Sequence, residues 1–599
     1  MKTISPSLRG VACAFATTIF ILFSSCGTET SKSSDVIAEQ AGTTVNVRVE
    51  DAVTNLNMYL SKTAYSLNVA LRIFQSLGDL DPKTQELVPM MVKALPLKRD
   101  VTEGPYKGML AFDFEILDEA VWDNGSPVTG KDVEFSFKIL FHPNLPTESW
   151  RSYFGYMVGM DVDPANPKKF TAYFNQYYML MVEGLCGIPI YPAYNYDPNN
   201  NLTNVPLADF LDPEKAEQLK NNPAVKAFAE EFLSPKYAND KNYVSGSGPY
   251  RLESTDGDQG TILIKKQGWW GDALLDKYPI LAAYPGRLSY KIVPDEAATE
   301  NYLKTEALDV VSNISPAKFL EMKQTRILAD KYDFHTYGAT QYTRWAMNMR
   351  SPKLNDKRVR QALAYLVDYD YLTKTVMQDL AERIVGPVNP SKSFYAKNVP
   401  LYQYNVEKAK SLLAEAGWAD TDKNGVLDKV INGVKTELSL DLITSFKSKP
   451  NELSSLSIKE NAQLAGIRIN VRDVDIERLS AETKEGRFET AIYGAAIRPG
   501  LVELYQSYHS ASLSPNGDNR TGFSQADSVI VAIRTTEDNA KRNALYIKAQ
   551  EIIHDEVPEV YLFAQLQRIV VAKKFDYVIS PNRPGYFEQM FKLKLKQTQ

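Results

Sequence analysis

Residues 121–137 read Val-Trp-Asp-Asn-Gly-Ser-Pro-Val-Thr-Gly-Lys-Asp-Val-Glu-Phe-Ser-Phe, and no other stretch of the chain says more about its fold. Gly125 and Pro127 shape a turn within it, because glycine adopts backbone conformations closed to other residues and proline restricts its own φ. Outward from this stretch, helix and strand signals alternate through most of the chain. That alternation is typical of α/β domains.

The alternation is clearest in the second half of the chain. Asn355 is a candidate N-cap, and it is followed at helical spacing by Val359, Ala362, Leu363 and Leu366. A second helix is expected over 406–416. A third, around 457–464, leads into residues 467–472, where apolar and polar side chains alternate as in a strand. Residues 161–242 differ, because Pro, Asn and Tyr interrupt regular elements there, and they predict an inserted subdomain with long loops.

The N-terminus predicts export. A basic start is followed by the apolar run 10–23 and by small residues before Cys26, as in a signal peptide of residues 1–25. The segment resembles a bacterial lipobox, in which the cysteine becomes the lipid-bearing first residue after cleavage. A plain secretory signal with a chance cysteine is the alternative. Residues 26–45, which lack a periodic apolar pattern, are expected to be a flexible tether after the lipidated cysteine.

Composition limits the partners of the exported part. The chain of 599 residues is 44% apolar and 24% charged, which is ordinary globular composition. Its net charge is −5, and cleavage would remove Lys2 and Arg9 but no acidic residue, giving −7. This balance, without a basic tract, argues against nucleic acid as a partner.

Catalytic and metal-binding motifs are sparse. The four histidines are far apart in the sequence, Cys186 is the single cysteine after Cys26, and no nucleophile elbow or Walker loop is present. We therefore predict no catalytic residues, no cofactor and no metal. One string, Asp420 to Asp428, matches part of a calcium loop, but Ile431 stands where the bidentate acid is expected. A tight turn explains the same residues, and both interpretations stay open.

Several separated strings together resemble one family, the extracellular solute-binding proteins of the oligopeptide, dipeptide and nickel type. Each string matches in the expected order over roughly residues 85–565. The strings are Phe112–Leu117 with Val121–Phe137, Gly246–Leu252, Ile292–Asp295 with Ala307–Val311, Lys357–Tyr365, and Glu407–Trp418.

The resemblance implies an α/β, two-lobed periplasmic-binding-protein fold, type II, of the large subclass with an inserted extra subdomain. Two hinge strands near 335–341 and 562–568 would join the lobes. The implied division is lobe I over 46–335 with the subdomain at about 75–245, lobe II over 338–563, and a return to lobe I over 568–599.

The resemblance also implies a function. Proteins of this family serve ATP-driven importers: solute binds between the lobes, closure buries it, and the closed form docks on the permease. We thus expect a monomeric, lipid-anchored binding protein of the cell envelope, on the periplasmic side of a membrane or on the cell surface. It would deliver a peptide-like or other medium-sized polar solute to the transmembrane subunits of the importer.

The chain departs from the family pattern at the site for a peptide's amino group. Peptide-binding members carry an aspartate in a segment resembling Trp-x-x-Asp-Tyr-x-x-Pro, whereas residues 493–500 here read Tyr-Gly-Ala-Ala-Ile-Arg-Pro-Gly. The acid is missing and Arg498 is nearby. Arg498 could pair with a carboxylate or phosphate through its two-pronged guanidinium, or it could be a structural arginine.

Aromatic and amide side chains supply the other candidates for solute contact. Tyrosine suits a cleft that holds varied solutes, because it combines a rigid ring with a hydroxyl tip. The candidates near the proposed hinge and in lobe II are Tyr337, Gln341, Tyr342, Trp345 and Tyr493, and those after the first strand are Asn55 and Asn57. Packing in the core is the alternative for the aromatic residues.

Two other functions compete with delivery to an importer. A solute sensor for a membrane partner would use the same cleft. An envelope hydrolase, the less favoured alternative, would instead need a convergent acid, base or nucleophile in that cleft.

Overall fold

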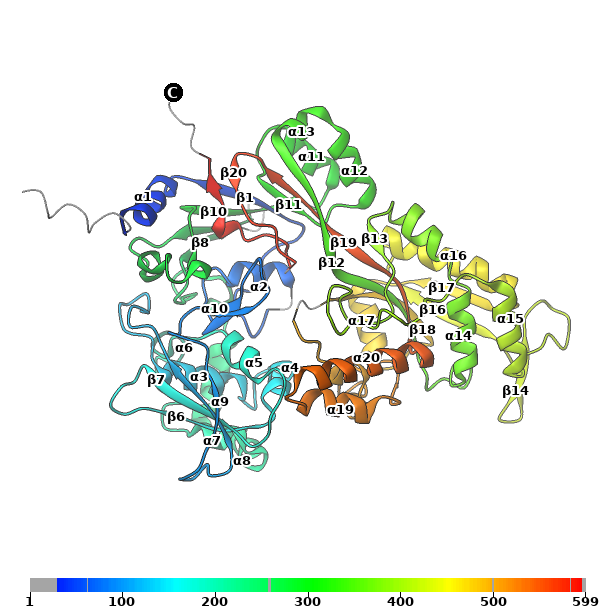
Figure 1. Ribbon diagram of the computed structural model, residues 1–599, viewed down its shortest axis with the longest axis horizontal. Coiled ribbons are helices and arrows are strands. Elements are labelled where there is room, and N and C mark those ends of the chain that lie inside the picture. Colours follow the sequence, from blue (N-terminus) through cyan, green and yellow to red (C-terminus); the bar gives the residue numbers. More distant parts are fainter. Residues whose placement is uncertain (1–29, 62, 257–259, 498–499, 582, 595–599) are drawn as a thin grey trace, which may run out of the picture.

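One mixed sheet runs through both halves of the protein. The computed structural model describes residues 30–594 except 62, 257–259, 498–499 and 582. Two long strands, β12 and β19, connect the halves (Figure 1). In sheet order the strands are β17 (Arg468–Asp473), β16 (Ser439–Thr444), β18 (Thr490–Ala496), β12 (Tyr332–Met347), β19 (Glu559–Ala572), β11 (Val310–Ser312), β1 (Thr44–Val49), β10 (Arg287–Ile292), β9 (Gly260–Lys265) and β8 (Tyr250–Asp256), with β13 (Ala381–Glu382) paired to β19.

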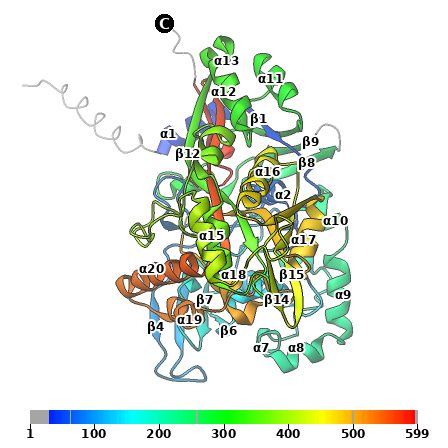
Figure 2. The same ribbon diagram turned by 90° about the vertical axis from the view of Figure 1, so that its right-hand side faces the viewer.

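The crossing strands are bent where the halves meet. β12 and β19 pair antiparallel along their length and lie side by side in both views (Figures 1 and 2). Their register shifts twice between Tyr337 and Gln341. A bulge of this kind bends a strand and increases its twist. The hinge strands expected near 335–341 and 562–568 lie on β12 and β19, so the names lobe I and lobe II are kept for the ranges given above.

Lobe II is a sheet covered by helices. Its strands β16, β17 and β18 continue the ladder from β12. The helices α14 (Lys357–Tyr365), α15 (Val406–Glu415) and α16 (Lys449–Leu464) share one apolar core with them. The cap of α14 is Asp356, whose side chain accepts the backbone N–H of Arg358, rather than the predicted Asn355. The stripe expected after it is buried at Val359, Ala362, Leu363 and Leu366.

The inserted subdomain has a sheet of its own. Its strand order is β4 (Lys98–Asp100), β5 (Leu110–Glu115), β7 (Lys169–Phe174) and β6 (Met157–Val162). The 121–137 stretch forms the turn and helix beside this sheet, and Thr129 and Asp132 cap the helix reciprocally. The helices are α3 (Gly130–Leu140), α4 (Glu148–Arg151), α5 (Met181–Gly187), α6 (Ala193–Tyr196), α7 (Leu207–Leu211), α8 (Pro213–Leu219), α9 (Pro223–Phe232) and α10 (Lys236–Asn239).

The remaining part of lobe I surrounds the parallel strands β1, β10 and β11. It contains α2 (Ala64–Ala70), α11 (Glu296–Lys304), α12 (Pro316–Gln324) and α13 (Arg326–Lys331). The described part of the flexible tether expected over 26–45, which begins at Thr30, contains a helix. A helix, α1, occupies Thr30–Gln40, and the Gln40 side chain exchanges hydrogen bonds with the backbone of Leu593. These two hydrogen bonds hold Gln40 against β21 (Lys592–Leu593), and composition gives no sign of such long-range contacts.

Three further α-helices of the described residues lie between β18 and β19 in the chain. They are α18 (Tyr505–Tyr508), α19 (Asp527–Thr535) and α20 (Asn539–Glu556). Their buried side chains Ile533 and Tyr546 belong to the same apolar cluster as Leu180 of the subdomain. The two lobes therefore pack against each other here. Across the described residues, none of the helices has the length and apolar character needed to cross a bilayer.

Candidate functional site

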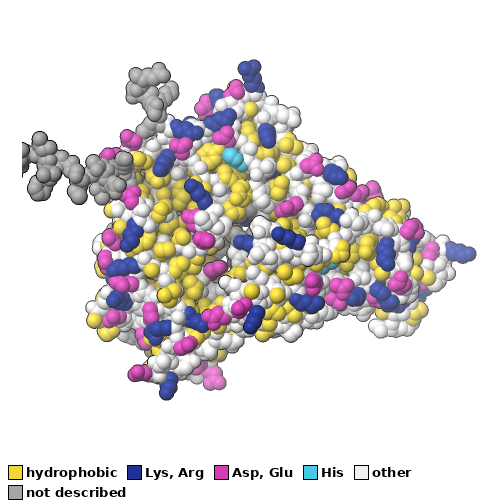
Figure 3. Space-filling model, in the orientation of Figure 1, with side chains coloured by type: hydrophobic (Ala, Val, Ile, Leu, Met, Phe, Trp, Pro, Cys, Tyr) yellow, Lys and Arg dark blue, Asp and Glu magenta, His cyan; other side chains and the backbone are white. Residues whose placement is uncertain are grey.

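A cavity of about 630 Å³ lies between the inserted subdomain and lobe II. The subdomain wall includes Trp150, Tyr153, Phe154, Leu180 and Glu183, and the lobe II wall includes Leu501, Glu503, Gln506, Ser507 and Asp518. In the space-filling view, the two halves of the molecule meet along a narrow furrow (Figure 3). The volume lies within the roughly 300–1,000 Å³ of small-molecule pockets in proteins.

The cavity walls combine aromatic rings with carboxylates. Trp150 and Tyr153 are partly exposed, so part of each ring is available to a solute. The two walls approach closely at Gly500, where an added Cβ would lie 3.4 Å from a carboxylate oxygen of Glu183. Apolar surface interrupted by a few oriented polar groups is the composition of sites for medium-sized polar solutes.

Glu503 is a fixed part of the lobe II wall. One of its carboxylate oxygens accepts a hydrogen bond from the hydroxyl of Tyr178 at 2.6 Å and from Nε of Arg534 at 3.1 Å. The other oxygen accepts the backbone N–H of Tyr505 at 2.9 Å. With three donors in this structure, the carboxylate is held in one orientation by the protein itself.

A buried ion pair joins the two crossing strands. Nη1 of Arg344 on β12 lies 2.7 Å from a carboxylate oxygen of Glu559 on β19. The hydroxyl of Tyr508, the residue that follows cavity-lining Ser507, donates to the other oxygen at 2.8 Å. Tyr342 and Tyr561 complete the surroundings, with ring centroids 5.4 Å apart. We call these residues the tyrosine cluster.

The environment of the tyrosine cluster shifts its pKa values. Burial raises the pKa of Tyr342 to about 12, so its hydroxyl stays protonated. Burial opposes the charge of Arg344, but Glu559 outweighs this and raises the pKa of the guanidinium above its usual range. The cluster is therefore a neutralised structural element, with its charges opposed inside the protein.

The predicted contacts on the hinge occupy different environments. Tyr337 is 38% exposed on β12. The Gln341 amide donates a hydrogen bond to Gln565 of β19 at 3.1 Å, across the bent part of the ladder. Tyr342 and Tyr493 lie in or beside the tyrosine cluster, where the Arg344 guanidinium is 4.6 Å from the Tyr493 ring. These four residues lie near the lobe junction but outside the lining of the 630 Å³ cavity.

Trp345 is buried away from the cleft, so its prediction as a solute contact is wrong. Its side chain is fully buried in the lobe II core. Successive residues of a strand point to opposite faces of the sheet. Because Tyr342 and Arg344 of β12 face the tyrosine cluster, Trp345 faces the helices on the other side. Trp345 therefore packs in the core, which was the alternative stated for the aromatic residues.

Asn57 is also a structural residue. It is 1% exposed, and its Oδ1 accepts a hydrogen bond from the hydroxyl of Tyr191 at 2.9 Å. Asn55 is partly exposed and accepts the backbone N–H of Asn57 at 2.8 Å, which closes a local turn. The amides predicted as solute contacts thus shape the segment after β1.

Two predicted residues, Arg498 and Cys26, lie outside the described residues. The chain position of Arg498 is informative because Gly500, two residues later, lines the cavity. Sequence reasoning did not find the aromatic wall of Trp150 and Tyr153 or the carboxylate of Glu503. The one signal available was the position of the 500–508 segment directly after the string in which the family aspartate is missing.

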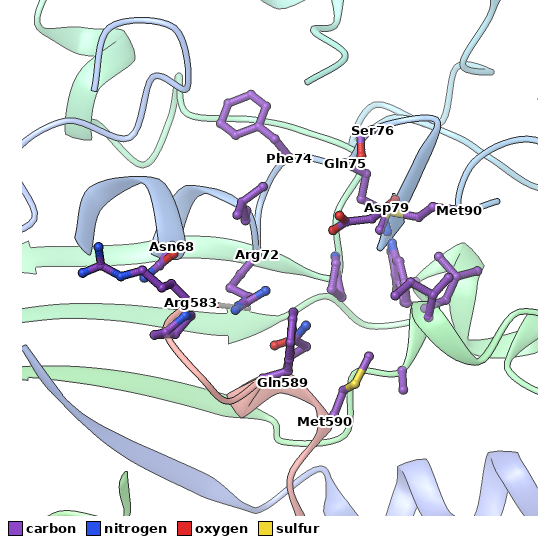
Figure 4. Close-up of a pocket in the computed structure, with 18 residues that line it drawn as sticks. Asn68, Arg72, Phe74, Gln75, Ser76, Asp79, Met90, Arg583, Gln589 and Met590 are labelled. Carbon is purple, nitrogen blue, oxygen red and sulfur yellow. The ribbon is translucent and has the colours of Figure 1, made fainter. Parts of the chain in front are cut away.

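A second pocket, in lobe I, is too small to hold such a solute. Figure 4 shows Arg72, Asp79 and Gln589 around it, and its volume is about 70 Å³. That is room for a few water molecules. Arg72 is held there by Glu588 at 2.9 Å, and burial raises the pKa of Asp79. This pocket belongs to the packing beneath α2.

The calcium-like string forms a turn before a hairpin of β14 (Asp428–Ile431) and β15 (Val434–Glu437). Carboxylate oxygens of Asp420, Asp422 and Asp428 lie within 4.8 Å of one another. Nζ of Lys435 lies 2.8 Å from Asp422 and 3.4 Å from Asp428. A lysine of the chain therefore supplies positive charge to these acids, which favours the turn interpretation.

Comparisons with known proteins agree with this architecture. The family model "Bacterial extracellular solute-binding proteins, family 5 Middle" matches residues 107–512. The oligopeptide-binding protein AppA of Bacillus subtilis is 24% identical over 558 residues, which cover 90% of this chain and 87% of that protein.

Solved structures share the fold. The structure of B. subtilis AppA with a nonapeptide superposes with a TM-score of 0.71 at 21% identity, covering 93% of this chain and all of AppA. NikA from Brucella suis with Fe(III)-EDTA superposes with a TM-score of 0.72 at 15% identity, covering 92% of this chain and all of NikA. These superpositions confirm the predicted two-lobed α/β fold.

Proposed function

Because the chain belongs to the bacterial extracellular solute-binding proteins of family 5, we propose that it captures a peptide-like or other medium-sized polar solute between its lobes and delivers it to the permease of an ATP-driven importer. The family is one of solute-binding proteins, and its members act outside the cytoplasmic membrane. The observation that carries the proposal is the 630 Å³ cavity, whose walls come from both sides of the hinge. Closure of such a cavity couples solute binding to a shape that a permease can recognise.

A peptide-like solute is favoured by a relative that matches 90% of the chain, since AppA of B. subtilis is named as an oligopeptide-binding protein. The cavity adds a physical reason. Partly exposed rings can pack on apolar side chains of a peptide, while Gln506 and Ser507 offer hydrogen bonds to its backbone. Sensing of the same solute for a membrane partner remains the second candidate, and an envelope hydrolase a third.

We further propose that the protein is a monomer held to the membrane by lipid on Cys26, with signal-peptide cleavage before that residue. The support is the sequence, in which Cys26 follows the apolar run 10–23 and the small residues Ser24 and Ser25. The anchor would keep the binding protein near its permease and so raise the effective concentration for docking.

Native mass spectrometry of the full-length protein, extracted from membranes without refolding, tests both proposals together. We expect a mass increase that maps to Cys26 after digestion, and a second, dissociable mass that belongs to the solute. A dissociated mass that matches a peptide supports the peptide-like class. An unmodified Cys26 peptide would refute the lipid anchor, and hydrolysis products from added peptides would favour the hydrolase.

Arg498→Ala is expected to weaken binding of an acidic ligand by about 1 kcal/mol or more, because the variant loses a cationic partner for the carboxylate. Titration calorimetry with Ala-Glu-Ala and Ala-Ala-Ala measures the effect, and the neutral peptide should lose less affinity. The control is Arg326→Ala, whose side chain is 95% exposed on α13. Equal affinities for Arg498→Ala and the parent would remove Arg498 from the site.

A further inference from the structure

The lobe junction beside the cavity contains polar contacts that cross from the subdomain to lobe II. Met179 of the subdomain donates its backbone N–H to the carbonyl oxygen of Arg534 on α19 at 2.9 Å. The neighbouring Tyr178 hydroxyl donates to Glu503 at 2.6 Å. Two consecutive residues of the subdomain thus bind to two lobe II residues that are themselves paired.

The lobe II side of this contact is a buried ion pair. Arg534 and Glu503 lie 3.1 Å apart, and their side chains are only 12% and 6% exposed. The guanidinium also lies 5.0 Å from the ring of Tyr178 and 4.2 Å from that of Tyr505. A carboxylate buried this deeply requires its hydrogen bonds, because an unsatisfied buried acceptor is costly.

The position of Tyr178 makes the ion pair sensitive to closure. Arg534 and the backbone of Tyr505 come from lobe II and stay with Glu503 when the lobes separate. Tyr178 comes from the opposite lobe and would leave with it. Opening would therefore remove one donor from Glu503 and admit water to the pair.

We propose that Tyr178, Glu503 and Arg534 form a latch that is complete only when the cleft is closed, and that this latch sets the balance between open and closed protein. The inference rests on the proposed function, because it assumes that the two lobes separate to admit solute. Glu503 lines the cavity, while Tyr178 acts through it and is a positioning residue. Solute affinity would depend on the latch, since the apparent affinity decreases when the fraction of closed protein decreases.

Tyr178→Phe tests the latch by removing one hydroxyl without changing the ring. We expect amide hydrogen exchange in peptides covering 177–181, which include the Met179 N–H, to become about tenfold faster or more. This factor follows from the loss of a hydrogen bond to a charged group. Small-angle X-ray scattering of the same variant should show a larger radius of gyration. Glu503→Gln, which weakens the contacts of the carboxylate with Tyr178 and Arg534, should act in the same direction.

Tyr250→Phe is the matched control. Its hydroxyl is equally buried and donates to the carbonyl oxygen of Pro285 at 2.8 Å, but both partners lie in lobe I. Exchange at 177–181 and the radius of gyration should stay at parent values. The latch is refuted if Tyr178→Phe behaves like Tyr250→Phe in both measurements. Neither measurement uses a solute, so this failure would leave the solute-binding proposal untouched, and failure to find a solute would leave the latch result standing.

Discussion

Glu559→Gln is expected to lower the free energy of unfolding by about 3–5 kcal/mol, because it leaves the Arg344 guanidinium buried without a counter-charge. Arg344 and Glu559 are 9% and 5% exposed, so water cannot replace the lost carboxylate. Glutamine keeps the size of the side chain and an oxygen that can accept from Tyr508. The decrease in the free energy of unfolding therefore comes from the missing charge and not from an empty cavity. Urea unfolding followed by tryptophan fluorescence measures it.

Two comparisons separate a buried charge from charge loss in general. Glu407→Gln removes an acid from an exposed pair with Lys410, whose side chains are 82% and 47% exposed, and should cost less than about 1 kcal/mol. The double variant Arg344→Leu with Glu559→Leu removes both charges and should be more stable than Glu559→Gln. A Glu559→Gln protein as stable as Glu407→Gln would show that the ion pair does not contribute as argued.

His142 is expected to destabilise the protein in acid by about 3 kcal/mol between pH 6.5 and pH 4. The side chain is fully buried between Phe210 and Phe228. Burial lowers the pKa of its imidazole to about 4, below the 6.5 of an unfolded chain. Between pH 6.5 and pH 4 the imidazole is therefore protonated in the unfolded state but neutral in the folded state. The stability that is present above pH 6.5 is lost as the pH falls toward 4.

The hydrogen bonds of His142 agree with a neutral ring. Nδ1 accepts the backbone N–H of Asn144 at 3.2 Å, so the proton of the neutral imidazole is on Nε2, which lies 3.1 Å from the carbonyl oxygen of Val225. His142→Gln cannot gain the proton, and its stability should fall less than that of the parent from pH 6.5 to 4.5. Carbon-13 NMR of labelled histidine should place the midpoint near 4. A midpoint near 6.5, or equal pH dependence of parent and variant, would contradict the argument.

Local patterns predicted the elements better than their contacts. Helical spacing places the apolar residues of α14 on one face, and this face can be read from the local sequence. The structure buries it in the lobe II core. The tether was different, since the Gln40 side chain donates a hydrogen bond to the backbone of Leu593, and a contact between residues 553 positions apart leaves no local signal.

The sequence alone determined the class of this protein: alternating helices and strands, together with strings of the solute-binding family, whose resemblance implied two strands that cross between lobes. These features follow from short-range periodicity and from strings that occur in order. Only the tertiary structure decided which residues line the cavity between the lobes. The cavity walls are built from segments near 150–188 and 500–518, which are hundreds of residues apart in the chain. The pleat of β12 points the Trp345 side chain to one face of the sheet, and that face is the one covered by the lobe II helices. Which face is covered cannot be read from the strand itself.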